Sequence, residues 1–198
     1  MRYRALAVLA LVLLAAPLAA KPKAAPTAPG TYTDWQDEID KLEIVASFEL
    51  GDYRRAVVEP FDTSQTPLPE ADDNTYAPVK ETLPRAAAPF AAQLGESLRG
   101  RIAVAEGTAG DGALVVRGRV AVMDPGSRAA RYWGGFGAGA ARTQLVLEVV
   151  DGDSGKVLLR IDQERRSGIG AAGGDYVKLM ERNLRKLGED VALVLAAF

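Results

Sequence analysis

Apolar residues recur at helical spacing in two parts of the chain. Between residues 79 and 98, and again between residues 176 and 195, apolar side chains advance by steps of three or four. This spacing predicts two amphipathic helices, each of which buries one face. Pro84 and Pro89 lie inside the first stripe and predict a kink or a late start there, and Asp175 is expected to cap the second helix.

A second pattern, the alternation of apolar and polar residues, predicts half-buried strands. In the segment 113–124 the alternation places Arg117 and Arg119 on one face, and the apolar residues up to Val122 on the other. The letters GDSG at 152–155 predict a hairpin turn. Strands are expected at residues 54–61, 101–106, 113–124, 143–151 and 156–167.

The segment 34–53, ahead of the first of these strands, has a less regular pattern. Trp35, Ile39 and Leu42 fall at helical spacing, which predicts a short helix or an irregular lead-in.

The order of the elements is strand, helix, strand, a meander of three strands, and helix. We therefore expect an α/β (α+β) fold of two layers. A mixed, mostly antiparallel sheet of four or five strands would carry both amphipathic helices on one face. The other face would carry arginines and glutamates and be either solvated or an interface.

The first twenty residues follow the pattern of a secretory signal. A basic start precedes an apolar run over 5–20 that ends in small residues. This run is short for a bilayer-spanning helix, so cleavage is expected after Ala20 or Ala19. The alternative is an uncleaved anchor.

This N-terminus sets the expected domain organisation and location. A signal peptide would occupy residues 1–20, a disordered linker of Pro, Ala and Lys residues 21–33, and a single α/β domain residues 34–198. The signal predicts export to the periplasm, and association with the outer membrane is an open extension of that prediction.

Missing residue types exclude several function classes. The chain has no histidine and no cysteine, which removes the commonest general base, a major metal ligand and the acylation site of a lipoprotein. Loss of Arg2 and Arg4 with the signal changes the formal net charge from −2 to −4, which argues against nucleic-acid binding. The acidic loop 62–78 is interpreted as solvated. We predict no enzymatic activity, no metal and no cofactor.

The segment 131–142, RYWGGFGAGAAR, combines small residues with three aromatic ones. Its letters GFGAG are similar to a phosphate-binding loop, but a strand follows where that motif needs a helix. The connection 125–142 is far longer than the about two to five residues of a plain hairpin loop, which favours a contact surface. The alternative is that the aromatic rings fold back over the sheet edge. The predicted contact residues are Arg131, Tyr132, Trp133, Gly135, Phe136, Gly137, Gly139 and Arg142.

The stretch VMDPGSRAARYWGGFGAGAARTQLVLEVVDGDSGKVL, residues 122–158, resembles the signature of an uncharacterised bacterial envelope family, domain of unknown function 4410. The tail GGDYVKLMERNLRKLGEDVALVL resembles the closing helix of that family, so the resemblance covers about residues 54–195. It implies an α/β fold and an envelope location but no activity.

The same stretch is more distantly similar to the curli-secretion channel lipoproteins. In those channels the corresponding region forms membrane-spanning hairpins of an oligomeric pore. The chain departs from them because it has no lipid-bearing cysteine. The matching positions are Gly126, Arg131, Tyr132, Gly135, Gly137, Gly139 and the strand 143–150.

Three functions remain open at this stage. The first is a non-enzymatic envelope protein that binds another envelope protein, a second copy of itself or the membrane periphery through residues 126–142. The second is a membrane-inserting oligomer or secretion-channel-like component. The third is a small-ligand carrier or an enzyme, which would need a pocket with converging polar groups.

Overall fold

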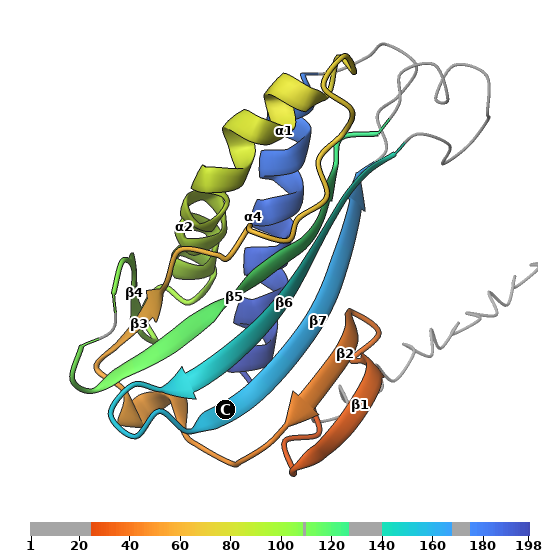
Figure 1. Cartoon of the computed structure of the whole chain (residues 1–198). Coiled ribbons are helices and arrows are strands. Elements are labelled where there is room, and N and C mark those ends of the chain that lie inside the picture. Colours follow the sequence, from red (N-terminus) through yellow and green to blue (C-terminus); the bar gives the residue numbers. More distant parts are fainter. Residues whose placement is uncertain (1–24, 109, 127–139, 168–174) are drawn as a thin grey trace, which may run out of the picture.

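The computed structural model describes residues 25–108, 110–126, 140–167 and 175–198. Within these residues the strands form one sheet with the order β1-β2-β7-β6-β5-β3-β4 (Figure 1). Neighbours from β1 to β5 are antiparallel, whereas β3 runs parallel to both β5 and β4. The strands are β1 (Gly30–Trp35), β2 (Ile39–Ile44), β3 (Arg55–Val58), β4 (Ala103–Glu106), β5 (Ala113–Asp124), β6 (Ala141–Asp151) and β7 (Val157–Ser167).

The helices cover one face of this sheet (Figure 1). They are α1 (Tyr76–Thr82), α2 (Ala87–Ser97) and α4 (Tyr176–Leu195). α4 packs on β6 and β7, and α2 packs on β4 and along α4. In the part of the chain that the structure describes, no helix has both the length and the apolar character needed to cross a membrane.

The two predicted amphipathic helices are confirmed, and so is the kink in the first. A 3-10 turn, Leu83–Arg85, separates α1 from α2 and has Pro84 near its start. Pro89 lies in the first turn of α2, where its missing N–H breaks no helical hydrogen bond. The carboxylate of Asp175 caps α4 by accepting the backbone N–H groups of Val177 and Lys178. The buried stripe of α1 and α2 consists of Val79, Leu83, Ala87, Phe90, Leu94 and Leu98.

The fold class is confirmed in outline, but the predicted size of the sheet is wrong. Seven strands and three α-helices lie among the described residues, in place of four or five strands and two helices. The meander β5-β6-β7 is at its predicted place. Two of the additional elements are β1 and β2, and the third helix arises because the proline kink divides the first predicted helix into α1 and α2.

The lead-in is a β-hairpin and not the short helix or irregular segment that its spacing predicted. Trp35 and Ile39 pair directly across its turn, so their helical spacing is the result of the turn between two strands. Asp34, Gln36 and Asp37 adopt positive φ angles of 49°, 56° and 59°. These angles ordinarily favour glycine or asparagine, neither of which signals this turn in the sequence. The predicted linker 21–33 also ends early, because β1 begins at Gly30.

A β-bulge corrects the predicted inner face of β5. Arg117 and Arg119 lie on the face opposite the helices, as predicted, but the register with β6 shifts between Val120 and Val122. The extra residue moves Val122 off the inner face, and Met123 becomes 2% exposed in its place.

Candidate functional site

Most of the predicted contact segment lies outside the residues that the structure describes. Arg142 is the exception: it is the second residue of β6, and 41% of its side chain is exposed. The predicted contact residues outside the described ranges are Arg131, Tyr132, Trp133, Gly135, Phe136, Gly137 and Gly139.

The structure does describe the two strand ends that hold this segment. β5 ends at Asp124, which pairs in register with Arg142 of β6. After β5 the chain turns at Gly126, whose φ of 73° favours glycine and whose N–H donates to the Asp124 carboxylate at 2.7 Å. The connection 125–140 therefore begins and ends on a regular antiparallel strand pair.

Charged side chains cluster beside these strand ends, on the face that the helices leave uncovered. Arg142 lies directly opposite Arg166 of β7. Glu164 lies near both arginines: its carboxylate accepts from Arg166 at 2.6 Å and lies 3.5 Å from Arg142. Asp124 of β5 lies on the other side of Arg142. Two acidic and two basic residues therefore stand together where the segment leaves β5 and enters β6, and their formal charges cancel.

Further along the same face, four charges form a row across four strands. Arg117 of β5 pairs with Glu148 of β6 at 3.0 Å, and Glu148 also contacts Arg160 of β7 at 3.3 Å. Arg160 in turn pairs with Glu43 of β2 at 3.1 Å. The backbone register places these four residues directly opposite one another. The row therefore alternates in sign, and each charge has an opposite neighbour.

The ion pairs of this row contribute little to the stability of the fold. Burial alone would raise the pKa of Glu148, but hydrogen bonds from Arg117 and Arg160 outweigh it and hold the pKa below its ordinary value. The side chains are between 33% and 48% exposed, and ion pairs at that exposure contribute little to stability. Each of the four charges in the row is therefore paired with at least one opposite charge.

A buried polar network on the helix side is a feature that sequence reasoning missed. Asp190 of α4 is 5% exposed and receives two hydrogen bonds from the guanidinium of Arg165. Gln163, which is 1% exposed, donates to Asp190 and to the backbone carbonyl of Glu38. The side chain of Glu38 also pairs with Arg165 at 2.9 Å. The network thus fastens α4 and the β1–β2 hairpin to β7.

Arg165 supplies the positive charge that faces Asp190 in this network. Burial raises the pKa of Asp190, and the hydrogen bonds from Arg165 and Gln163 offset part of that rise. Hydrogen bonds to Asp190 and Glu38 raise the pKa of Arg165, which stays protonated. The residues of this network come from α4, β7 and the β1–β2 hairpin, so no local sequence pattern predicts the network.

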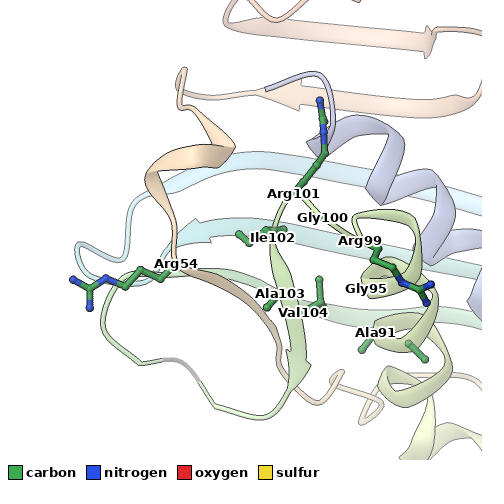
Figure 2. Close-up of a pocket in the computed structure, with 10 residues that line it drawn as sticks. Arg54, Ala91, Gly95, Arg99, Gly100, Arg101, Ile102, Ala103 and Val104 are labelled. Atoms are coloured by element: carbon green, nitrogen blue, oxygen red, sulfur yellow. The ribbon is translucent and has the colours of Figure 1, made fainter.

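A shallow groove at the opposite edge of the sheet was also not predicted. It has a volume of about 610 Å³ and lies between α2 and the edge strand β4. Arg54, Arg99 and Arg101 surround the start of β4, and Figure 2 shows that their guanidinium groups point away from one another. The groove therefore lacks the converging polar groups that would hold one compact ligand.

Comparison with known proteins places this fold in a family. A family model described as "Domain of unknown function (DUF4410)" matches residues 57–173, which is more than half of the chain. The chain belongs to the DUF4410 family. This confirms the resemblance seen in the glycine-rich stretch. The match runs from within β3 to beyond β7, so β1, β2 and α4 lie outside it.

Solved structures give more distant likenesses. Two structures of the PelC dodecamer from Paraburkholderia phytofirmans are 14% identical, with TM-scores of 0.45 and 0.46. They cover 75% and 76% of this chain and 95% and 94% of their own. Protein XCC0632 from Xanthomonas campestris, described by the DUF330 family model, is 15% identical with a TM-score of 0.35, covering 74% of this chain and 86% of its own. No curated protein matches the chain significantly.

Proposed function

We propose that this DUF4410 protein is an exported, non-enzymatic envelope protein that works by binding. Its partner is another envelope protein or a second copy of the chain, and contact is made through residues 126–142. The secretory pattern of residues 1–20 supports the periplasmic location and an association with the outer membrane.

The observation that carries this proposal is the way the segment is held. β5 and β6 stay paired up to Asp124 and Arg142, and the connection 125–140 is far longer than a hairpin requires. Its composition also suits a contact surface, because tyrosine, tryptophan, phenylalanine and arginine are enriched at protein interfaces.

Substitution of two glycines of this segment tests the proposal. The variant Gly137→Leu/Gly139→Leu should reduce the mass of the complexes that the mature chain forms and its recovery with the envelope fraction. Gly51→Leu is the matched control, since Gly51 is exposed and a Cβ atom added there meets no heavy atom within 4 Å. Sedimentation velocity and envelope fractionation provide the measurements. Unchanged complexes and unchanged fractionation of the double variant would refute the interface.

A carbonate wash separates this proposal from the membrane-inserting alternative. A protein bound at the periphery should be released by the wash, whereas one whose strands span the bilayer should stay with the membrane. Retention after the wash would favour the secretion-channel-like alternative.

A further inference from the structure

We propose that the groove beside β4 is a second binding site, which takes an extended acidic peptide as an added strand. This site lies at the far edge of the sheet from β1, and none of its lining residues belongs to the glycine-rich segment. Its test is therefore independent of the function proposed above.

The first observation is the free backbone edge of β4. β4 pairs with β3 on one side, and the N–H of Gly107, just after β4, donates to the carbonyl of Val58 at 3.0 Å. Because backbone groups alternate in direction along a strand, Val104 and Glu106 direct their N–H and C=O groups away from β3. No described residue pairs with that side. Such an edge is a template for an incoming strand.

The second observation is the space beside that edge. Small residues of α2, including Ala92 and Gly95, form the wall of the groove that faces β4. Val104 packs against α2, since a Cβ atom added at Gly95 would lie 3.3 Å from its Cβ. The small residues therefore leave the volume of about 610 Å³ in which the side chains of a short strand fit.

The third observation is the charge at the start of β4. Arg54, Arg99 and Arg101 lie on different sides of this strand end (Figure 2). Since their guanidinium groups diverge, one phosphate cannot meet all three, but a chain with several carboxylates can. Glu106 lies at the other end of β4 and disfavours acidic residues there. The acidic residues of the peptide should therefore lie next to the start of β4.

The arginines differ in how free they are to bind. Arg101 donates to the carbonyl of Ala196 at 2.5 Å and so is fixed in place. Arg99 pairs with Glu96 at 3.2 Å, but their side chains are 78% and 64% exposed, so this weak pair yields readily to a ligand. Within the described residues, no hydrogen bond or ion pair holds the guanidinium of Arg54. Arg54 and Arg99 are therefore the residues to vary.

The experiment is fluorescence anisotropy with a labelled octapeptide of alternating valine and threonine that ends in three glutamates. The peptide should bind the wild-type chain, and a version ending in three lysines should bind at least tenfold more weakly. The variants Arg54→Ala and Arg99→Ala should each weaken binding by up to about fivefold, the range of an exposed ion pair. Ala92→Glu, an exposed change in the groove wall, should weaken it at least tenfold.

Two controls identify the binding mode. Arg85→Ala, in the 3-10 turn that precedes α2, should leave the affinity unchanged, and far-UV circular dichroism checks that every variant folds. A peptide with N-methylated alternate amides keeps its charge but cannot add to the edge, so it should lose binding. Equal binding of the N-methylated peptide, no effect of Ala92→Glu, or no binding of the acidic peptide to the wild-type chain would each overturn the proposal.

Discussion

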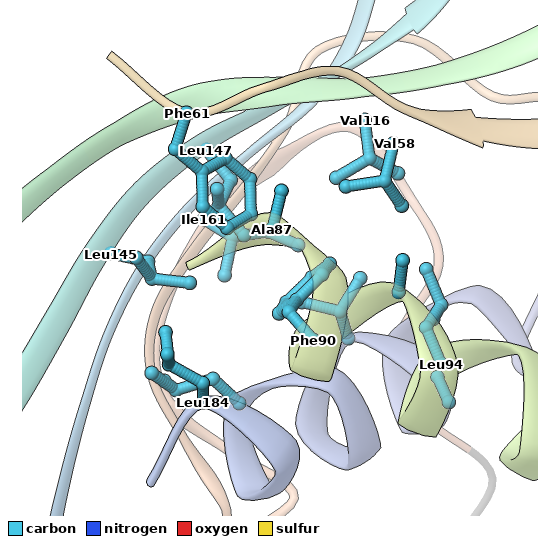
Figure 3. Packing of buried hydrophobic residues seen from close by; sticks show 14 of the residues in the cluster. Val58, Phe61, Ala87, Phe90, Leu94, Val116, Leu145, Leu147, Ile161 and Leu184 are labelled. Carbon is cyan, nitrogen blue, oxygen red and sulfur yellow. The ribbon is translucent and has the colours of Figure 1, made fainter. Parts of the chain in front are cut away.

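Gly188 lies where α4 crosses α2, and its replacement with alanine tests how the helix layer is packed. A Cβ atom there would overlap the backbone carbonyl oxygen of Phe90 and lie 3.2 Å from the backbone nitrogen of Leu94. Figure 3 shows the side chains of Phe90 and Leu94 on α2 close to α4. Backbone atoms cannot rotate out of the way as a side chain can, so Gly188→Ala must push the helices apart.

Two opposing contributions set the size of the effect. Overpacking of this kind costs about 1–3 kcal/mol. Alanine in place of glycine in a helix interior stabilises by up to about 1 kcal/mol. Since the added Cβ atom overlaps backbone atoms of α2, overpacking outweighs helix propensity, and we expect a net loss of about 1–2 kcal/mol. For a chain of this size that corresponds to a fall in Tm of roughly 2–8 °C.

Thermal and urea unfolding followed by far-UV circular dichroism measures this change. Gly51→Ala is the matched control, because a Cβ atom at Gly51 meets nothing within 4 Å and its φ is not positive. The control should be neutral or stabilised by a few tenths of a kcal/mol. A Gly188→Ala variant as stable as the wild type would refute the close crossing of α2 and α4.

Three further predictions concern the rest of the fold. Burial and the hydrogen bond to Asp151 raise the pKa of Tyr53 from 10.0 to about 12. The stability that the neutral form of Tyr53 provides is therefore complete below pH 10 and is lost as the pH rises from 10 through 12. Denaturation at a series of pH values should therefore show that the free energy of unfolding falls more steeply for the wild type than for Tyr53→Phe. Parallel plots of unfolding free energy against pH would contradict this. Asp190→Ala should lower the free energy of urea unfolding by about 2–3 kcal/mol. This is less than for a fully buried pair, because the side chain of Arg165 is 30% exposed and keeps its ion pair with Glu38. A loss below about 1 kcal/mol would count against the network. Met123→Ala should destabilise by about 2–5 kcal/mol and Val122→Ala by less than about 1 kcal/mol, and the reverse order would exclude the bulge.

The parts of the fold that the sequence predicts well are those whose periodicity is long. The stripe of α4 extends over 20 residues, and the alternation of β6 over most of its 11, so that each pattern repeats often enough to identify its element. Asp175 adds a chemical signal to the first of these, since its carboxylate caps the helix.

The parts that fail have short or interrupted patterns. In the β1–β2 hairpin the turn places Trp35 and Ile39 four residues apart, as a helix would, and no glycine marks the positive φ angles between them. In β5 a single extra residue exchanges the faces of Val122 and Met123, and nothing local in the sequence signals it. Both errors arise because the deciding contacts are with other strands.

The candidate sites also differ in how well the sequence predicts them. The glycine-rich segment is visible in the sequence because its composition and length are unusual, and the paired ends of β5 and β6 agree with its role as a connection. The groove beside β4 could not be predicted, because Arg54 and Arg99 are 45 positions apart in the sequence. They come to line the same groove only when β4 pairs with β3. The Arg165–Asp190 pair likewise joins a strand to a helix that packs on it.

Site-specific photo-cross-linking in cells tests whether residues 126–142 form the contact surface. A photoreactive amino acid replaces Trp133 in the contact segment, and a second strain carries it at the exposed Arg185 on α4 as the control. Position 133 should cross-link to an envelope protein or to a second copy of the chain, in the periplasmic or outer-membrane fraction, whereas position 185 should not. Absence of cross-links from position 133, or the same products from both positions, would contradict it.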